Sequence, residues 1–361
     1  MVRRRREAAP PGTTGVSRNF HRLLAVVLAT AVTLAVAEIL VRLVEPSPFR
    51  PTAVEDEHLS DVTRPDFRDR VYRLEKDPGT FRILAVGDSF TWGDGVLPED
   101  TYADRLARQL ERLQPGRKFE VINWSRPGWN THEAWRSLRD ADLEWHEDLL
   151  LVGYVLNDAE PSSQAERAPL HRRIAPRAPG SALSLLLYRH SRLFARLFDA
   201  VENLRRRVAI DRFYRGLYEG DTWEDAKRSL WRLRRMARAD GAQTVVVIFP
   251  VFDPRLGPDY PYRELHDRVA SAAEEMGIPA LDLLPQYEGM DPRRLAVNPF
   301  ADPHPDELAH RIAADAIARF LVREKLLQRK PPGPGGGRPA AAEGPPEPGR
   351  GPRRGESPHP L

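Results

Sequence analysis

A serine that follows an apolar run is the first feature of this sequence that could do chemistry. The run Ile83–Val86, in FRILAVGDSF, stops at Gly87 and is followed by Ser89. In an open α/β sheet, the residues just after a strand lie at its carboxyl edge, where ligands bind. A serine hydroxyl is a weak nucleophile unless a neighbouring base activates it. We therefore expect Ser89 to be a nucleophile if a base reaches it, with Gly87 allowing a tight turn and Gly93 and Gly95 allowing close backbone approach.

Three other motifs that combine strands with glycines are excluded by spacing. A G-x-S-x-G elbow is absent because Thr91 occupies the last glycine position. A phosphate-binding G-x-x-x-x-G-K-[ST] loop is absent because no lysine follows the glycines. The segment GDGVLP lacks the third glycine of a dinucleotide-binding fingerprint.

The candidate base lies far along the chain, in FADPHPDELAH. Asp302 and His304 stand there just before the last helix, in whose first turn we expect Pro305. A carboxylate two residues from an imidazole can orient the ring and stabilise its charged form. A zinc site is disfavoured because His304 and His310 are six residues apart, whereas H-E-x-x-H places its histidines four apart. We expect His310 to be structural.

Two further strand ends offer hydrogen-bond donors for a developing oxyanion. Gly128 follows a predicted strand at 120–125, and Asn157 ends a predicted strand at 148–158. Backbone N–H and side-chain amide groups placed at the same edge as a nucleophile would stabilise the tetrahedral intermediate of acyl transfer. Asp88 and Asp158 are expected to accept hydrogen bonds within their turns.

The order of elements from residue 81 onward predicts an α/β fold with a mostly parallel sheet. The region 159–240 interrupts the alternation with helical patterns at 183–204 and 222–239. These helices either pack on the sheet or form a cap that selects substrates or faces the membrane. The expected strands are 81–88, 120–125, 148–158, 244–252 and 280–284, and the expected helices are 102–113 with Thr101 as N-cap, 131–142, 260–276 and 305–327.

These motifs together resemble the SGNH (GDSL) hydrolase superfamily. GDSF at 87–90 resembles the family's block I, and the blocks follow in the family's order over residues 83–326. The matching residues of the later blocks are Gly128 in NWSRPGWNT for block II, Asn157 in GYVLND for block III, and Asp302 with His304 in DPHPDELAH for block V.

The resemblance implies a three-layer α/β/α SGNH-hydrolase fold with a mostly parallel five-stranded sheet. It also implies that Ser89 is the nucleophile and His304 the base. The oxyanion hole would consist of the backbone N–H groups of Ser89 and Gly128 and the amide of Asn157. Many members place the aspartate three residues before the histidine, whereas here Asp302 lies two residues before it. No cofactor and no metal are implied.

The N-terminal region predicts a membrane segment. Residues 23–37 carry no charge, and apolar residues resume after Glu38, so 23–41 is long enough to span a bilayer. The arginines before it place the N-terminus in the cytoplasm and the rest outside, on the periplasmic side if the host is a bacterium. A cleaved signal peptide is the alternative, because residues 35–37 have the small-x-small form of a cleavage site. Both interpretations export the domain.

Charge and composition limit the remaining classes of function. The whole chain carries +3, residues 1–22 carry +5 and residues 329–361 carry +3, so the part between them carries −5. An acidic folded part argues against nucleic acid as a partner. The absence of cysteine excludes disulfides and a thiol nucleophile. The predicted organisation is a basic cytoplasmic N-terminus (1–22), a transmembrane signal-anchor (23–41), a linker (42–80), the hydrolase domain (81–328) with a helical insertion (about 159–240), and a disordered Pro/Gly-rich tail (329–361).

The sequence therefore predicts a membrane-anchored serine esterase that removes acyl groups from an envelope glycan, a lipid or a small ester. The close alternative is an O-acyltransferase that acts on extracytoplasmic polysaccharide with the same triad of Ser89, His304 and Asp302. A catalytically silent, membrane-anchored binding module is the alternative from another class. Trp92 and Trp129 fall inside the motifs and are candidate contacts to a sugar ring of an acylated glycan.

Overall fold

The computed structural model describes residues 14–44, 72–252, 256–298 and 302–328. The tail, most of the predicted linker and the first part of the basic N-terminus lie outside the described residues. The chain divides into two compact units, one of residues 1–54 with 174–210 and the other of residues 55–173 with 211–361. The second unit contains all the residues that the motifs single out.

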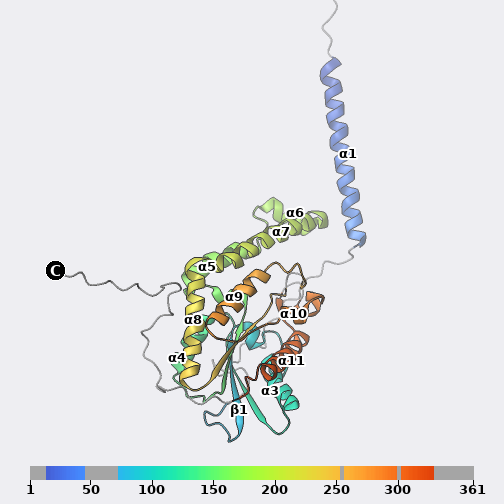
Figure 1. Ribbon diagram of the computed structural model, residues 1–361. Helices are drawn as coiled ribbons and strands as arrows, with labels where there is room; N and C mark the ends of the chain where they lie inside the picture. Colours follow the sequence, from blue (N-terminus) through green and yellow to red (C-terminus); the bar gives the residue numbers. More distant parts are fainter. Residues whose placement is uncertain (1–13, 45–71, 253–255, 299–301, 329–361) are drawn as a thin grey trace, which may run out of the picture. The chain divides into compact units, whose positions relative to one another are not determined.

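The second unit is built on a parallel sheet that lies between helices (Figure 1). The sheet has five strands in the order β2-β1-β3-β4-β5. The chain leaves β1 toward one edge and returns to the other side of β1 for β3. The carboxyl ends of β1 and β3 therefore flank the switch point at which ligands bind in such sheets. The strands are β1 (Thr80–Gly87), β2 (Lys118–Ser125), β3 (Leu149–Tyr154), β4 (Gln243–Ile248) and β5 (Ala280–Asp282).

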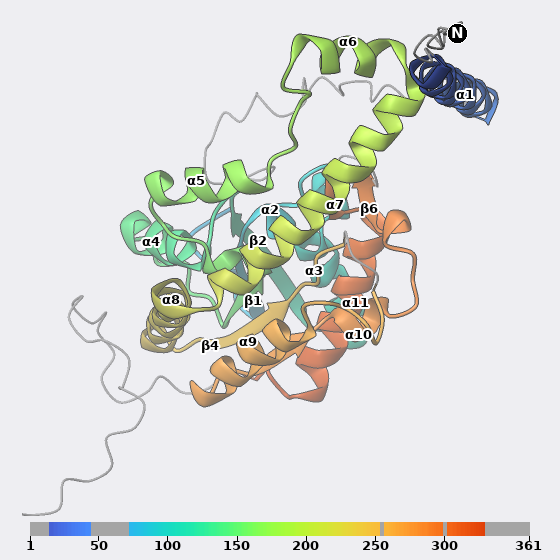
Figure 2. The same cartoon turned by 90° about the horizontal axis from the view of Figure 1, so that it is seen from above.

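Helices cover both faces of the sheet, so the predicted three-layer α/β/α fold is confirmed. Figure 2 shows α3 (Tyr102–Leu113) and α11 (Glu307–Arg323) on one side of the sheet. The other side carries α4 (Thr131–Ala141), α8 (Gly220–Ala239) and α9 (Arg263–Glu275). All eight residues of β1 and all six of β3 are buried, as expected for central strands of a doubly covered sheet. Thr101 is the N-cap of α3, as predicted, because its hydroxyl accepts from the Asp104 backbone N–H over 3.3 Å.

Two boundaries near the motifs differ from the sequence prediction. Pro305 is not in the first turn of the last helix; it ends the short strand β7 (Asp302–Pro305), which pairs antiparallel with β6 (Ala296–Asn298). The helix begins after Asp306, whose carboxylate caps it by accepting from the Ala309 N–H over 2.9 Å. The third strand ends at Tyr154, so Asn157 lies in a 3-10 turn, η2 (Leu156–Ala159), and not in the strand.

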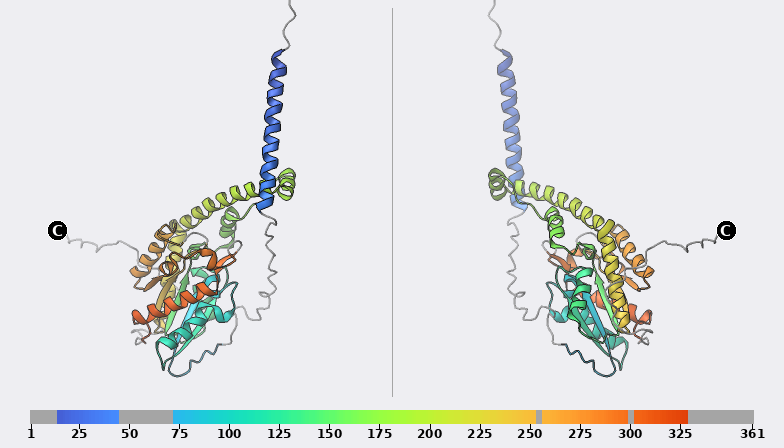
Figure 3. Two further views of the ribbon diagram at one scale, coloured as in Figure 1. Left: turned by 90° about the vertical axis from the view of Figure 1, so that its right-hand side faces the viewer. Right: turned by 90° about the vertical axis from the view of Figure 1, so that its left-hand side faces the viewer.

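The first unit consists of long helices. Its N-terminal helix α1 (Thr14–Val44) contains a segment, Phe20–Leu43, that is long and apolar enough to cross a membrane, with a mean hydropathy of 2.5. The helical pattern predicted at 183–204 forms two helices, α6 (Ala182–His190) and α7 (Arg192–Leu217), which are visible in Figure 3; the part of α7 up to Ile210 belongs to this unit. The remaining short elements are α2 (Ser89–Trp92), η1 (Pro98–Asp100), α5 (Gln164–Ile174), α10 (Leu284–Tyr287) and η3 (Pro292–Arg294).

Candidate active site

Ser89 is the first residue of α2, directly beyond the carboxyl end of β1. Asp88 caps this short helix, because its carboxylate accepts from the Phe90 backbone N–H over 2.9 Å. A second hydrogen bond holds α2 against β2, because the Asn123 amide of β2 donates to the Thr91 carbonyl over 2.8 Å. Ser89 is therefore held by buried hydrogen bonds on both sides and is itself 8% exposed.

The structure gives Gly87 a different role from the expected one. A Cβ at Gly87 would collide with the hydroxyl of Thr91, and a Cβ at Gly153 on β3 would collide with the same hydroxyl. The two glycines make room for a buried threonine between two neighbouring strands. Glycine is thus needed at position 87 because no side chain fits beside Thr91. The backbone does not require it, since Gly87 has no positive φ.

The next two glycines serve the backbone after the helix. Gly93 and Gly95 have φ values of 80° and 82°, a region that glycine adopts without strain. A Cβ at Gly95 would also meet the side chain of Val297 in β6. These glycines close the loop against the β6–β7 hairpin.

His304 reaches Ser89 from β7. Its Nε2 lies 2.9 Å from Ser89 Oγ, although 215 residues separate the two in the sequence. The imidazole lies beside the ring of Phe90, with 5.5 Å between the ring centroids. With Nε2 unprotonated, the serine hydroxyl donates to the imidazole, which is the arrangement that activates a serine. Asp302 belongs to β7, but its side chain falls outside the described residues.

Asn157 lies beside the same turn and contacts the residue before the serine. Its side-chain amide donates to Asp88 Oδ2 over 3.1 Å. Burial raises the pKa of Asp88, while the hydrogen bonds from Phe90 and Asn157 and the charge of His304 act in the opposite direction. The Asp88 carboxylate thus links the helix that carries the serine to the amide of Asn157.

Gly128 lies on the loop after β2, which reaches the same edge of the sheet. The Arg126 N–H donates to the Gly87 carbonyl over 3.3 Å, so the loop starts beside the end of β1. Arg167 in α5, buried and not identified from the sequence, donates to the Gly128 carbonyl over 2.9 Å and to Glu133 over 2.6 Å. Its only sequence signal is an arginine in a polar helix, which does not distinguish it from its exposed neighbours.

Asp158 fills the turn role that the sequence predicts for it. Its carboxylate accepts from the Thr131 hydroxyl over 2.9 Å and from the Val155 N–H over 2.7 Å. Burial raises the pKa of Asp158 well above its ordinary value, and the nearby Asp88 raises it further. These contacts tie α4 to η2, which carries Asn157.

The other aromatic and histidine residues of the motifs have separate places. Trp92 is 4% exposed, which leaves the half-buried Trp129 as the better placed candidate contact to a substrate. His310 is fully buried, and its Nδ1 accepts from the Tyr102 N–H over 3.1 Å. His310 therefore joins α11 to α3, as the structural role predicted for it requires.

The family is settled by comparison with known sequences. The profile of the GDSL-like Lipase/Acylhydrolase family matches residues 85–312, which include Ser89, Gly128, Asn157 and His304. The chain belongs to this family. Membership makes it an ester-hydrolysing enzyme of the SGNH type, as the sequence motifs predict. A comparison with curated proteins found no match.

Solved structures with a similar chain path are distant in sequence. TesA is 17% identical, with a TM-score of 0.41, and the match covers 66% of this chain and 97% of TesA. A catalytic mutant of Axe2, an acetylxylan esterase from Geobacillus stearothermophilus, is 17% identical, with a TM-score of 0.41 and coverage of 66% and 93%. A two-domain esterase active on acetylated mannans is 15% identical, with a TM-score of 0.38 and coverage of 72% and 52%.

Proposed function

We propose that this acylhydrolase is a serine esterase in which Ser89 is the nucleophile and His304 the general base. The observation that carries the proposal is the 2.9 Å distance between His304 Nε2 and Ser89 Oγ. Asp302, two residues before His304, is assigned the orienting role of the third triad member. Its place in β7 keeps its backbone on the hairpin that presents the imidazole.

The reaction follows from these positions. Ser89 Oγ attacks the ester carbonyl carbon while its proton passes to His304 Nε2, which gives a tetrahedral oxyanion. The C–O bond to the alcohol then breaks, and the imidazolium returns the proton to the leaving oxygen. Water, deprotonated by the same imidazole, attacks the carbonyl carbon of the acyl-enzyme. The imidazolium then protonates Ser89 Oγ as its bond to the acyl group breaks, which releases the carboxylic acid and regenerates the serine hydroxyl.

The oxyanion is assigned three donors at the carboxyl edge of the sheet. They are the backbone N–H groups of Ser89 and Gly128 and the side-chain amide of Asn157. Ser89 opens α2, so its N–H is not used by the helix. Asn157 is held beside the same turn through Asp88. Donors fixed in advance stabilise the intermediate without reorganisation.

The substrate class follows from the predicted location of the enzyme. The helix that contains residues 23–41 is assigned as an uncleaved membrane anchor, and the arginines before it place the N-terminus in the cytoplasm. The catalytic unit then lies on the extracytoplasmic side, the periplasm in a bacterium. Acylated envelope glycans are esters found there, and Trp129 supplies an aromatic face for a sugar ring.

The test is ester hydrolysis by the full-length protein in detergent. Wild type, Ser89→Ala and the control Ser229→Ala are assayed with p-nitrophenyl acetate, p-nitrophenyl butyrate and acetylated xylan. Ser229 is a buried serine in α8 that donates to the Asp225 carbonyl, so its loss leaves the site intact. We expect activity that is lost in Ser89→Ala alone. Full activity in Ser89→Ala contradicts the assignment, and acyl transfer to added glycan without release of acid indicates the acyltransferase.

A further inference from the structure

An apolar stripe runs along the first part of α7. Leu197, Val201, Leu204 and Val208 recur at the spacing of one helical face. Their exposed fractions are 58%, 70%, 64% and 45%. Four large aliphatic side chains in a row are unusual on a water-facing helix, because single exposed residues are common but continuous apolar patches mark interaction sites.

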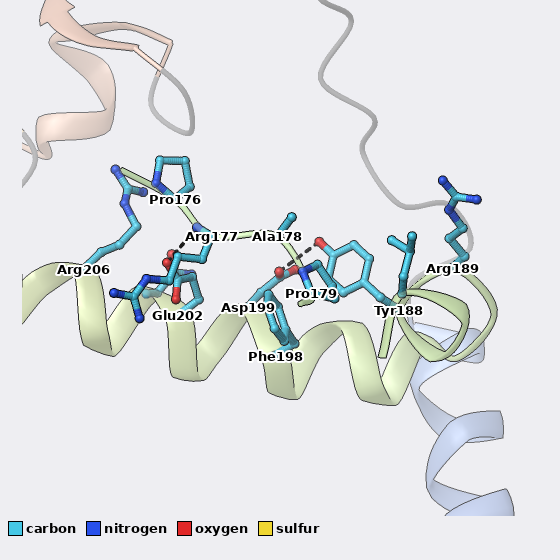
Figure 4. A pocket seen from close by; sticks show the side chains of 12 residues that line it. Pro176, Arg177, Ala178, Pro179, Tyr188, Arg189, Phe198, Asp199, Glu202 and Arg206 are labelled. Carbon is cyan, nitrogen blue, oxygen red and sulfur yellow. Dashed lines mark hydrogen bonds between the residues drawn. The ribbon is translucent and has the colours of Figure 1, made fainter. Parts of the chain in front are cut away.

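The opposite face of α7 is turned toward other parts of the same unit, α6 and the segment 176–179. A cavity of about 520 Å³ lies there, lined by α6, α7 and the segment 176–179. Figure 4 shows Asp199 and Glu202 pointing from α7 toward this segment. Asp199 accepts from the Tyr188 hydroxyl over 2.9 Å, and Glu202 accepts from the Arg177 N–H over 3.0 Å. The acidic groups of α7 in this unit are therefore turned away from the apolar stripe.

Positive charge borders the stripe. The segment 174–210 contains seven arginines and only two acidic residues, Asp199 and Glu202. Arg196 and Arg207 are exposed. Around the helix axis they lie about 100° from the stripe, which is the rotation between two successive residues. An apolar face bordered by arginines is the pattern of a helix that lies in the interface of an anionic bilayer. The arginines can extend to the headgroups while their stems stay in the apolar layer.

Hydrogen bonds fix the start of α7 to the end of α1. The Glu38 carboxylate accepts from the backbone N–H groups of Arg192 and Leu193 over 3.0 and 2.9 Å, and from the Ser191 hydroxyl over 2.8 Å. Arg42 donates to the His190 carbonyl over 2.8 Å. Figure 3 shows α7 beginning beside this end of α1. Glu38 therefore serves as the N-terminal cap of a helix that starts 154 residues later in the chain.

This junction sets the depth of α7. The apolar segment of α1 ends at Leu43, and at 1.5 Å per residue Glu38 lies about 8 Å before that end. When α1 spans a bilayer, the start of α7 is thus held at the level where the acyl chains meet the headgroups. Helix α7 then departs from the anchor at the depth that suits an apolar stripe bordered by arginines.

We propose that the first part of α7 is a membrane-surface helix, with its apolar stripe in the acyl-headgroup boundary and its arginines on anionic lipid headgroups. The inference rests on the membrane anchor in the proposed function and adds a second contact with the bilayer. A lipid surface fits better than a protein partner because the junction with α1 brings the stripe to the bilayer whether or not another protein is present. The net positive charge of the segment complements anionic lipids.

The absence of cysteine allows a direct test of depth. Three full-length variants, Val201→Cys, Asn203→Cys and Val27→Cys, are labelled with the environment-sensitive fluorophore NBD. They are reconstituted into vesicles of phosphatidylcholine and phosphatidylglycerol, with and without lipids that carry a doxyl quencher. Val201 is in the stripe, Asn203 is an exposed residue on the other face of α7, and Val27 is inside the apolar segment of α1.

We expect labels at 201 and 27 to be blue-shifted and to lose most of their fluorescence to the doxyl lipid, while the label at 203 is not quenched. Removal of phosphatidylglycerol should weaken quenching at 201 and leave quenching at 27 unchanged. A label at 201 that is as unquenched as the one at 203 overturns the inference, and a blue shift at 201 without quenching does so by showing that protein covers the stripe. A label at 27 that stays in water overturns the anchor and this inference together, while esterase activity at Ser89 is measured independently.

Discussion

The side-chain amide of Asn157 donates to the Asp88 carboxylate, so the residue before the serine also holds the assigned oxyanion donor. The same carboxylate caps α2 through Phe90. One buried acid therefore couples the position of the nucleophile to the position of the donor. Neither contact is with a reacting atom, and this makes Asp88 a positioning residue.

Replacement of Asn157 or Asp88 should lower the turnover rate with little change in KM. Asn157→Ala removes a donor that we assign to the oxyanion of the transition state, and we expect a fall in kcat on the order of 100- to 1000-fold. Asp88→Asn keeps the shape but leaves one oxygen for two donors, so a smaller fall, roughly tenfold, is expected. Steady-state kinetics with p-nitrophenyl acetate distinguish the two parameters. A rise in KM at constant kcat would show that these residues bind the ground state instead.

Arg167 allows a similar test on the loop after β2, which carries Gly128, the other assigned oxyanion donor outside α2. Arg167→Met removes the hydrogen bonds to the Gly128 carbonyl and to Glu133, and we expect kcat to fall roughly tenfold while KM stays within about twofold. Arg172→Met is the control, because Arg172 is exposed on the same helix. Equal loss of activity in both variants, or loss that follows thermal stability alone, would contradict a positioning role for Arg167.

The buried carboxyl of Asp158 predicts a dependence of stability on pH. Its pKa is raised by burial, so between its unfolded and folded pKa values the native state holds a proton that the unfolded state has released. The free energy of unfolding then decreases as pH rises through this window, by up to about 1.4 kcal/mol per pH unit. Urea unfolding of wild type and Asp158→Asn from pH 4 upward should show wild type losing stability relative to the variant.

Asp140→Asn is the control for that measurement. Arg139 lowers the pKa of Asp140, so this exposed carboxyl is ionised in both the folded and the unfolded state above about pH 5. The difference between wild type and Asp140→Asn should therefore be constant from about pH 5 upward. A constant difference for Asp158→Asn as well would show that the Asp158 carboxyl is ionised in the folded protein.

Arg82, a buried arginine near the amino end of β1, should contribute much more to the free energy of unfolding than an exposed arginine does. Arg82 is 1% exposed, and its guanidinium donates to the carbonyls of Leu74 and Trp145 over 2.7 and 2.5 Å and to Glu120 over 2.6 Å. Arg82→Met leaves these acceptors without their donor, and we expect a loss of about 3 kcal/mol in unfolding free energy. The exposed control Arg136→Met should change it by less than about 0.5 kcal/mol. Similar values for the two variants would refute this role of Arg82.

The sheet and the motif positions could be predicted from local patterns. The apolar runs before Ser89 and Asn157 indicate strands that are buried on both faces, and parallel strands bring their carboxyl ends to one edge. The distance from Ser89 to His304 could not be derived in this way, since 215 residues separate them. The place of His304 beside Asp302, just before the last helix, makes it a candidate base, and the resemblance of the ordered motifs to a family implies its pairing with Ser89.

Features that depend on distant partners were missed. The β6–β7 hairpin contains the two prolines that flank His304, and prolines so close together predict a loop. The break between α6 and α7 at Ser191 is capped by Glu38, which no local pattern can indicate. Arg82 in an apolar strand likewise acquires its partners from segments that only the fold brings near.

Ser89 is proposed to carry the acyl group during turnover, and trapping of the acyl-enzyme is the decisive measurement. The full-length protein is mixed with p-nitrophenyl acetate, quenched in acid within the first turnovers and digested for mass spectrometry. We predict an acetyl group on the peptide that contains Ser89, absent from Ser89→Ala and strongly reduced in His304→Asn. Acetylation at another residue that forms and decays at the turnover rate, with Ser89 unmodified, would contradict it.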